Sequence, residues 1–327
     1  MTTVDESLKM SALCWLASTL IVWLCLWLFR VFVIPMFTLS DRGASKRIRS
    51  YMHDSSESTS TELSSPFALI TGATGSIGSA FAEYLAREGY SLILTGRSES
   101  ALEVAAKTIS TKHPSVTILT RVCDLNSHVS IRNLVESLSE INVAVLVNNA
   151  GAVNVLPDDA LDIPPEVLED ILAVNVQGTT LLTRLMLPKL KARKNCLIIF
   201  MGSITGSLPC PMVSYYSASK AYTHALGIAL QEELRPSAIT VLVAAPAWIA
   251  SNMTLTKRTS LLIISPDHFV RCLFKARWTS TVVNPYYWHR VVESALGMLP
   301  EMIRTRMQYS QLINARSKIQ RKLKKDK

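Results

Sequence analysis

The first strong pattern along the chain is a long apolar run near its N-terminus. Residues 10–29 contain no charged side chain, and the apolar character resumes after Arg30 and continues to Phe37. At about 1.5 Å per residue, such a helix spans a bilayer core of roughly 30 Å. The run is too long for a signal-peptide core, and no small-residue cleavage site follows it. It predicts a short segment at 1–9 and an uncleaved transmembrane anchor at 10–37, with a buried core helix as the alternative.

Polarity then changes twice. A Ser-rich stretch without helical or strand periodicity predicts a linker at 38–65. From Phe67 onward, short apolar runs alternate with segments in which apolar residues recur at helical spacing, and the first of these segments begins at Ile77. The expected strands lie at 67–70, 91–95, 116–122, 143–147, 196–201 and 239–244, and further helices at 101–110 and 129–138. Strands that are apolar on both faces and alternate with helices are typical of a covered parallel sheet. The pattern predicts an α/β fold, a Rossmann-type doubly wound parallel sheet, as a single domain at 66–300.

The net charge of +9 is concentrated at the C-terminal end, in the basic tail expected at 301–327. Nine of its residues are basic against Asp326 and Glu301: Arg304, Arg306, Arg316, Lys318, Arg321, Lys322, Lys324, Lys325 and Lys327. This distribution argues against a nucleic-acid partner. The tail either contacts anionic lipid headgroups or forms a solvated helix end, and the sequence favours neither interpretation over the other.

Charge around the apolar run predicts its orientation. Asp5, Glu6 and Lys9 precede it, whereas the following residues carry a basic excess that begins at Arg30 and continues at 42–49. The positive side of a membrane span faces the cytosol. The last four residues, 324–327, resemble the dilysine retrieval signal of endoplasmic-reticulum membrane proteins. Together these features predict an endoplasmic-reticulum membrane protein whose domain faces the cytosol.

Cysteine and histidine usage adds two exclusions. The six cysteines form no CxxC pair, and the six histidines are scattered. We therefore expect no metal site and no disulfide framework, in agreement with a reducing compartment.

A glycine-rich turn joins the first strand to the first helix. It reads Thr71-Gly72-Ala73-Thr74-Gly75-Ser76-Ile77-Gly78. Glycine permits a tight turn and a close approach of cofactor, and the free N–H groups of the helix terminus suit a pyrophosphate. The candidate dinucleotide-binding residues here are Gly72, Thr74, Gly75, Ser76, Ile77 and Gly78.

The end of the second strand bears on cofactor choice. An acid there would repel a 2′-phosphate, whereas Arg97 offers a planar donor fork that suits one. The sequence therefore favours NADP(H) over NAD, with a plain surface arginine as the alternative.

Four residues suggest the chemistry of a carbonyl reductase. They are Asn175, Ser203, Tyr216 and Lys220, in that order along the chain. Hydride addition to a ketone leaves negative charge on oxygen, which requires a proton donor. A free tyrosine has a pKa of about 10, and we expect the charge of Lys220, one helical turn away, to lower that of Tyr216. Tyr215 is off the face of Lys220.

This set, with the TGxxxGxG turn and Asn148-Asn149-Ala150-Gly151, resembles the short-chain dehydrogenase/reductase family. The resemblance implies that Lys220 also binds the nicotinamide ribose and that Ser203 binds the carbonyl oxygen. It also implies that Asn175 holds a relay water. Further cofactor contacts implied by it are those of Asp124, Leu125, Asn149, Ile249 and Ser251. Ala247 stands where the family usually has glycine.

The C-terminal third resembles one branch of this family, which contains microsomal very-long-chain 3-oxoacyl-CoA reductases and steroid 17β-dehydrogenases. The resemblance implies a substrate lobe at 252–300 and NADPH-dependent reduction of a lipid ketone. It also implies fatty-acid elongation enzymes as partners and allows for a homodimer. A 17-ketosteroid or 3-ketosphinganine substrate is the alternative. A non-catalytic nucleotide-binding scaffold is a third hypothesis.

Overall fold

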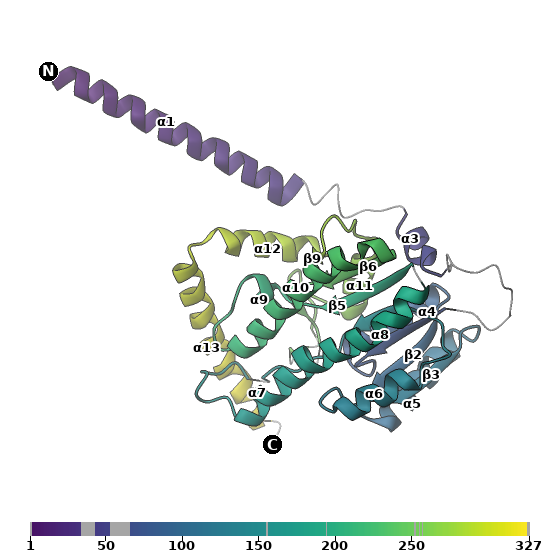
Figure 1. Cartoon of the computed structure of the whole chain (residues 1–327). Helices are drawn as coiled ribbons and strands as arrows, with labels where there is room; N and C mark the ends of the chain where they lie inside the picture. Colours follow the sequence, from purple (N-terminus) through teal and green to yellow (C-terminus); the bar gives the residue numbers. More distant parts are fainter. Residues whose placement is uncertain are drawn as a thin grey trace.

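The computed structural model describes residues 2–33, 43–52, 66–154, 156–193, 195–251, 253–254, 256 and 258–325. A long helix, α1 (Thr2–Leu28), projects from a rounded α/β domain (Figure 1). It ends in a short π-helix, η1 (Phe29–Val33). A 24-residue stretch of these helices, Met10–Val33, is long and apolar enough to cross a membrane, and its most apolar 18-residue window contains no buried residue. Residues 34–37 of the expected anchor lie outside the described part.

A seven-stranded parallel sheet forms the centre of the domain, in the order β3-β2-β1-β4-β5-β6-β9. Its strands are β1 (Phe67–Thr71), β2 (Ser91–Gly96), β3 (Ile118–Val122), β4 (Val143–Asn148), β5 (Cys196–Met201), β6 (Ile239–Ala244) and β9 (Val282–Val283). The predicted strands at 196–201 and 239–244 are confirmed residue for residue. Strand order reverses between β1 and β4, which opens a crevice at the carboxyl ends of these strands.

Helices cover both faces of the sheet (Figure 1). Side chains alternate along β1, so that Ala68 and Ile70 face one core cluster and Leu69 faces the other. The first cluster is covered by α4 (Ser76–Arg87), α5 (Glu99–Lys112) and α11 (Pro266–Lys275), and the second by α6 (His128–Glu136), α8 (Thr179–Arg193) and α10 (Ser214–Leu234). The doubly wound fold expected from the alternating pattern is thereby confirmed.

Shorter elements complete the chain. They are α7 (Pro165–Leu172), the π-helix η2 (Ala173–Gly178), α9 (Ile204–Ser207), η3 (Arg235–Ser237), the pair β7 (Trp248–Ile249) and β8 (Ile263–Ile264), and α12 (Tyr287–Met298). The expected basic tail forms α13 (Glu301–Lys325), where Arg316 pairs with Asp158 at 2.8 Å. Of the dilysine-like end, residues 326–327 lie outside the described part.

Part of the expected linker is a packed helix, α3 (Ala44–Ser50). Ile48 is 1% exposed, and the Tyr90 hydroxyl donates to its carbonyl at 2.6 Å. Arg47 donates to the carbonyls of Phe274 and Ala276 at 2.9 and 2.7 Å. The prediction of an irregular chain is therefore wrong for these residues, because contacts with distant parts of the domain stabilise a helix that its own sequence barely signals. The rest of the expected linker, 38–42 and 53–65, lies outside the described residues.

Candidate active site

The glycine turn after β1 has the geometry that the sequence predicts. Gly72 adopts a φ of 62°, which favours glycine. A Cβ on Gly78 would stand 2.2 Å from the Gly72 carbonyl oxygen, so the close contact of α4 with the turn excludes any side chain there. Gly75 is the N-cap of α4 and carries no capping side chain. The first N–H groups of α4 are therefore available to an anionic ligand.

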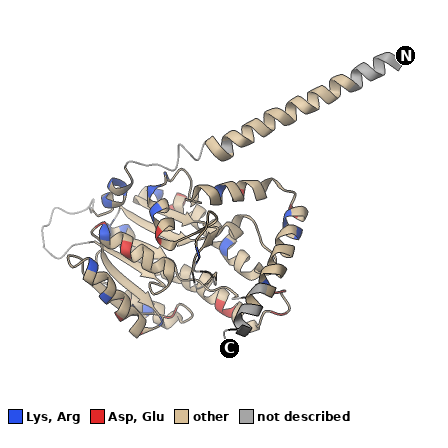
Figure 2. Ribbon diagram, turned by 180° about the vertical axis from the view of Figure 1, so that it is seen from behind, with Lys and Arg blue, Asp and Glu red and all other residues tan. Residues whose placement is uncertain are grey.

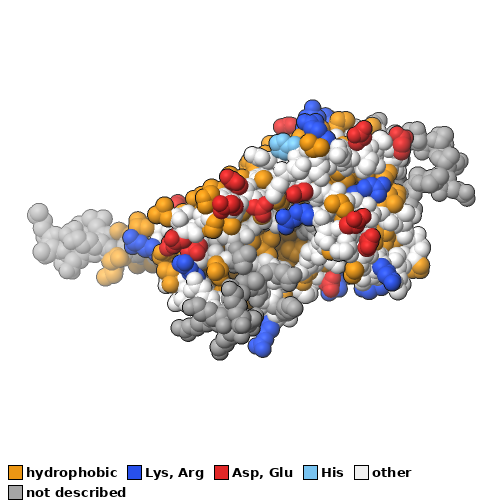
Figure 3. All heavy atoms as spheres, turned by 90° about the horizontal axis from the view of Figure 1, so that it is seen from below, with side chains coloured by type: hydrophobic (Ala, Val, Ile, Leu, Met, Phe, Trp, Pro, Cys, Tyr) orange, Lys and Arg blue, Asp and Glu red, His pale blue; other side chains and the backbone are white. Residues whose placement is uncertain are grey.

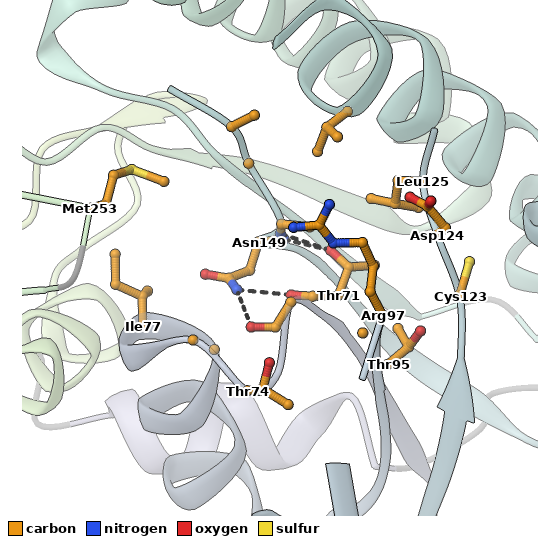
Figure 4. Close-up of a pocket in the computed structure, with 18 of the residues that line it drawn as sticks. Thr71, Thr74, Ile77, Thr95, Arg97, Cys123, Asp124, Leu125, Asn149 and Met253 are labelled. Atoms are coloured by element: carbon orange, nitrogen blue, oxygen red, sulfur yellow. Dashed lines mark hydrogen bonds between the residues drawn. The ribbon is translucent and has the colours of Figure 1, made fainter. Parts of the chain in front are cut away.

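A cavity of about 370 Å³ lies over this turn, at the carboxyl ends of β1, β2 and β4 (Figure 4). Seen from below, the surface is hollowed near its centre, with hydrophobic side chains inside the hollow (Figure 3). The cavity brings together eleven of the residues proposed from the sequence: Gly72, Thr74, Gly75, Ser76, Ile77, Gly78, Arg97, Asp124, Leu125, Asn149 and Ser251. A dinucleotide fits this arrangement, since a helix terminus, an exposed guanidinium and apolar side chains line one continuous space.

Arg97 and Asn149 have different roles in the cavity wall. The exposed Arg97 follows the last residue of β2, and its guanidinium extends over the cavity (Figure 4). Asn149 instead donates from Nδ2 to the carbonyls of Thr71 and Gly72, at 2.8 and 3.1 Å. It therefore joins the end of β4 to the glycine turn, while Arg97 remains available for a ligand.

Tyr216 and Ser203 are brought together beside the cavity. The Ser203 Oγ accepts from the amide and the hydroxyl of Thr205, at 3.2 and 3.0 Å, as the N-cap of α9. The Tyr216 hydroxyl is hydrogen-bonded to the Ser203 side chain. Both hydroxyls can therefore point their protons at one substrate oxygen.

Lys220 lies on the same face of α10 as Tyr216. Its Nζ is 5.5 Å from the centre of the Tyr216 ring and donates to the Met201 carbonyl at 2.7 Å. Burial lowers the pKa of Lys220 to about 8, so the group keeps most of its charge at pH 7. Burial raises the pKa of Tyr216 to about 12, and the hydrogen bond with Ser203 opposes this only in part. The pKa of Tyr216 is therefore raised in this structure and not lowered as expected, because desolvation is the larger influence.

Asn175 occupies a π-helical turn, a local distortion that is frequent at functional sites. Its Nδ2 donates to the Ala152 carbonyl at 2.9 Å and to the Ser219 hydroxyl at 3.0 Å. Gly151, which lines the cavity, separates this turn from Lys220: a Cβ at 151 would stand 3.3 Å from Asn175 Oδ1 and 3.7 Å from Lys220 Nζ. Asn175 and Lys220 therefore lie directly behind the cavity wall, whereas none of the four proposed catalytic residues is among the described residues that line the cavity.

Three further residues line the cavity: Asp170, Val174 and Met253. Val174 directly precedes Asn175, whereas Asp170 and Met253 belong to no recognisable motif and had no signal in the sequence. Ile249, proposed as a cofactor contact, is buried in β7 and is not among the cavity-lining residues. The amide of Ala247 donates to Nδ1 of the fully buried His289 at 3.2 Å, which fixes the turn that lacks the usual glycine.

His224 lies one turn beyond Lys220 on α10 and is 7% exposed. Two glycines make room for its ring, since a Cβ on Gly202 or Gly206 would stand 2.7 or 2.8 Å from Nε2. Nδ1 is 3.4 Å from the Ser207 hydroxyl. Burial and the charge of Lys220 lower the pKa of His224 to about 4.

The fold, the glycine turn and this group of side chains define a nucleotide-dependent oxidoreductase. Residues 66–261 match the family model described as short chain dehydrogenase. The chain belongs to this family, and the resemblance inferred from the sequence is confirmed.

Two relatives and two solved structures define the similarity further. The very-long-chain 3-oxoacyl-CoA reductase of Coccidioides immitis (strain RS) is 30% identical over 292 residues, which cover 84% of this chain and 77% of that protein. The reductase of the same name from Aspergillus terreus (strain NIH 2624 / FGSC A1156) is 36% identical over 207 residues, 63% of this chain and 59% of that protein. A short-chain dehydrogenase from Sphingobium yanoikuyae in complex with NADPH is 27% identical, with a TM-score of 0.59, and covers 64% of this chain and 82% of its own. A 3-ketoacyl-(acyl-carrier-protein) reductase from Brucella melitensis complexed with NADH is also 27% identical, with a TM-score of 0.59, and the match covers 66% of this chain and 94% of that one.

Proposed function

We propose that this chain is a membrane-anchored, NADP(H)-dependent reductase that converts the 3-oxo group of very-long-chain acyl-CoA to a 3-hydroxy group. The observation that carries the proposal is the grouping of Tyr216, Ser203 and Lys220 near the cavity that the glycine turn and Arg97 line. The similarity to very-long-chain 3-oxoacyl-CoA reductases over most of the chain supports this substrate class.

The chain's own residues provide binding and proton transfer. Arg97 would hold a 2′-phosphate, and the N-terminus of α4 would hold the pyrophosphate. When bound, NADPH supplies the hydride that reaches the carbonyl carbon.

Tyr216 then donates its proton to the carbonyl oxygen, while Ser203 donates a hydrogen bond to the same oxygen. The Tyr216 pKa of about 12 suits a donor that must remain protonated until the substrate oxygen becomes negative. The nearby ammonium of Lys220 stabilises the tyrosinate that results. Asn175, which lies behind Gly151, would hold the water through which a replacement proton reaches Lys220.

The same proposal includes a location. The apolar helix α1 anchors the chain in the endoplasmic-reticulum membrane, with the domain in the cytosol, beside the condensing and dehydrating enzymes of fatty-acid elongation. The exposed apolar surface of α1 and the basic residues that follow it support this arrangement. Protease protection in sealed microsomes tests it: the domain should be digested without detergent.

The test of activity uses the purified full chain in detergent with NADPH. Oxidation of NADPH is followed with long-chain 3-oxoacyl-CoA, a 17-ketosteroid and 3-ketosphinganine in separate reactions. We expect turnover with the acyl-CoA and a loss of about 10²–10⁴-fold in kcat for Tyr216→Phe. Tyr215→Phe is the matched control and should keep its activity. Turnover with the steroid or sphingoid ketone alone would contradict the substrate class, and an unaffected Tyr216→Phe would contradict the mechanism.

A further inference from the structure

Helix α12 has its polar residues on the inside. His289 is fully buried, and its Nε2 lies 2.9 Å from the Leu262 carbonyl oxygen. Glu293, one turn later, accepts from the buried Asn284 side chain at 3.0 Å, and burial raises its pKa. Residues four apart share a helix face, so this face points into the protein. A helix on the surface of a water-soluble domain usually has the opposite arrangement.

The outward face of α12 is apolar. Trp288, Val291, Ala295 and Met298 follow one another at steps of three and four residues, which places them opposite His289. Ala295 is exposed, and Trp288, Val291 and Met298 are partly exposed, as are the two charged residues of α12, Arg290 and Glu293. In Figure 2, basic residues are sparse on this helix compared with α3 and α13.

The apolar surface continues beyond the end of α12. Met302 and Ile303, in the first turn of α13, are 65% and 56% exposed. These two large exposed side chains extend the apolar surface of α12 past Pro300. We call the six residues Trp288, Val291, Ala295, Met298, Met302 and Ile303 the α12 face.

This face begins where the apolar N-terminal helix ends. The ring of Phe32 in η1 lies 6.4 Å from the ring of Tyr287, the first residue of α12, and Val31 is 2% exposed. Figures 1 and 2 both show the lower end of α1 above α12. The helix that spans the bilayer therefore leaves it beside the N-terminus of α12.

We propose that the α12 face is a second membrane contact, which lies in the headgroup region of the same bilayer that α1 crosses. The inference rests on the proposed anchor, and it commits to lipid because the face is continuous with that anchor. Tryptophan at one end and aliphatic side chains along the rest are typical of an interfacial helix. Since His289 joins α12 to the 260–264 segment, the contact places the proposed substrate lobe at the membrane surface.

Site-specific photo-crosslinking of the full chain in phosphatidylcholine nanodiscs tests this. The photoreactive amino acid p-benzoylphenylalanine replaces Ala295, and in a second variant Met302, because both positions are exposed. Leu20 in α1 is the positive control, and Val104, 67% exposed on α5 far from the anchor, is the negative control. NADPH binding verifies that each variant is folded.

We expect lipid adducts at positions 20, 295 and 302 and none at 104. Adducts at 20 without any at 295 or 302 would overturn the inference and leave the proposed anchor intact. Adducts between 295 or 302 and a second copy of the chain would also overturn it, in favour of a protein interface. If position 20 itself gave no lipid adduct, the anchor and the inference would fall together.

Discussion

The buried imidazole of His224 should make the protein sensitive to mild acid. A histidine has a pKa of about 6.5 in an unfolded chain. In the folded protein the pKa is lowered to about 4, because burial and Lys220 oppose its charge. Between these values the unfolded state binds more protons than the folded state, so acid favours unfolding. Stability from this group is present above pH 6.5 and is lost as the pH falls toward 4.

The size of the effect follows from the two pKa values. At pH 4.5 nearly every unfolded molecule but only about a quarter of folded molecules would carry this proton, which costs the fold about 2–3 kcal/mol relative to pH 7. For a domain of this size, that corresponds to a fall in Tm of roughly 5–10 °C.

The perturbation is His224→Gln, which keeps a polar side chain of similar size between Gly202 and Gly206. Thermal unfolding of the full chain in detergent is measured at pH 7 and pH 4.5 for both proteins. Other titrating groups, including Glu293 and His289, are common to both and cancel in the difference. On acidification from pH 7 to pH 4.5, we expect the variant to lose about 2–3 kcal/mol less stability than the parent. Equal losses in both proteins would refute the linkage.

Three further predictions concern the cofactor cavity and α3. Arg97→Ala should raise the KM for NADPH by about 10–100-fold with little change for NADH, because a charge-assisted phosphate contact contributes about 1.5–3 kcal/mol; steady-state kinetics with both cofactors checks this. Gly78→Ala forces a methyl group against the Gly72 carbonyl and should destabilise the protein by about 1–3 kcal/mol and weaken NADPH binding, as measured by fluorescence titration. Arg47→Ala removes two hydrogen bonds to the end of α11 and the contact of its guanidinium with Trp278 at 4.1 Å. It should lower the Tm by roughly 4–8 °C while the KM for NADPH stays unchanged, since α3 lies away from the cavity.

The elements and motifs that the sequence revealed are those with local signals. Strands buried on both faces, such as 196–201, are apolar at every position, and the glycine turn is marked by Gly72, Gly75 and Gly78. The spacing of Tyr216 and Lys220 fixes their common helix face without further knowledge. Local pattern was therefore sufficient for six of the seven strands and for the order of the proposed catalytic residues, but it did not reveal the two-residue strand β9.

Other features depend on contacts between distant residues. Asp170 lines the cavity only because α7 packs near the end of β3, where its carboxylate accepts from Asn126 at 2.5 Å. The pKa of Tyr216 could not be inferred from the nearness of Lys220, because burial depends on the whole surrounding fold. Helix α3 was missed for the same reason, since its partners lie more than a hundred residues away in Arg193 and Phe274.

Helix α3 also bears on how a soluble form of this enzyme could be prepared. The family match begins at residue 66, and a chain cut there would lack the carbonyls of Tyr51 and Met52, to which the buried Arg193 donates. The phenol of Tyr90 would likewise lose the Ile48 carbonyl. Such a truncation removes the proposed membrane anchor but also leaves buried polar groups with fewer partners, so a shortened protein should begin before Gly43 to retain the stability of the parent.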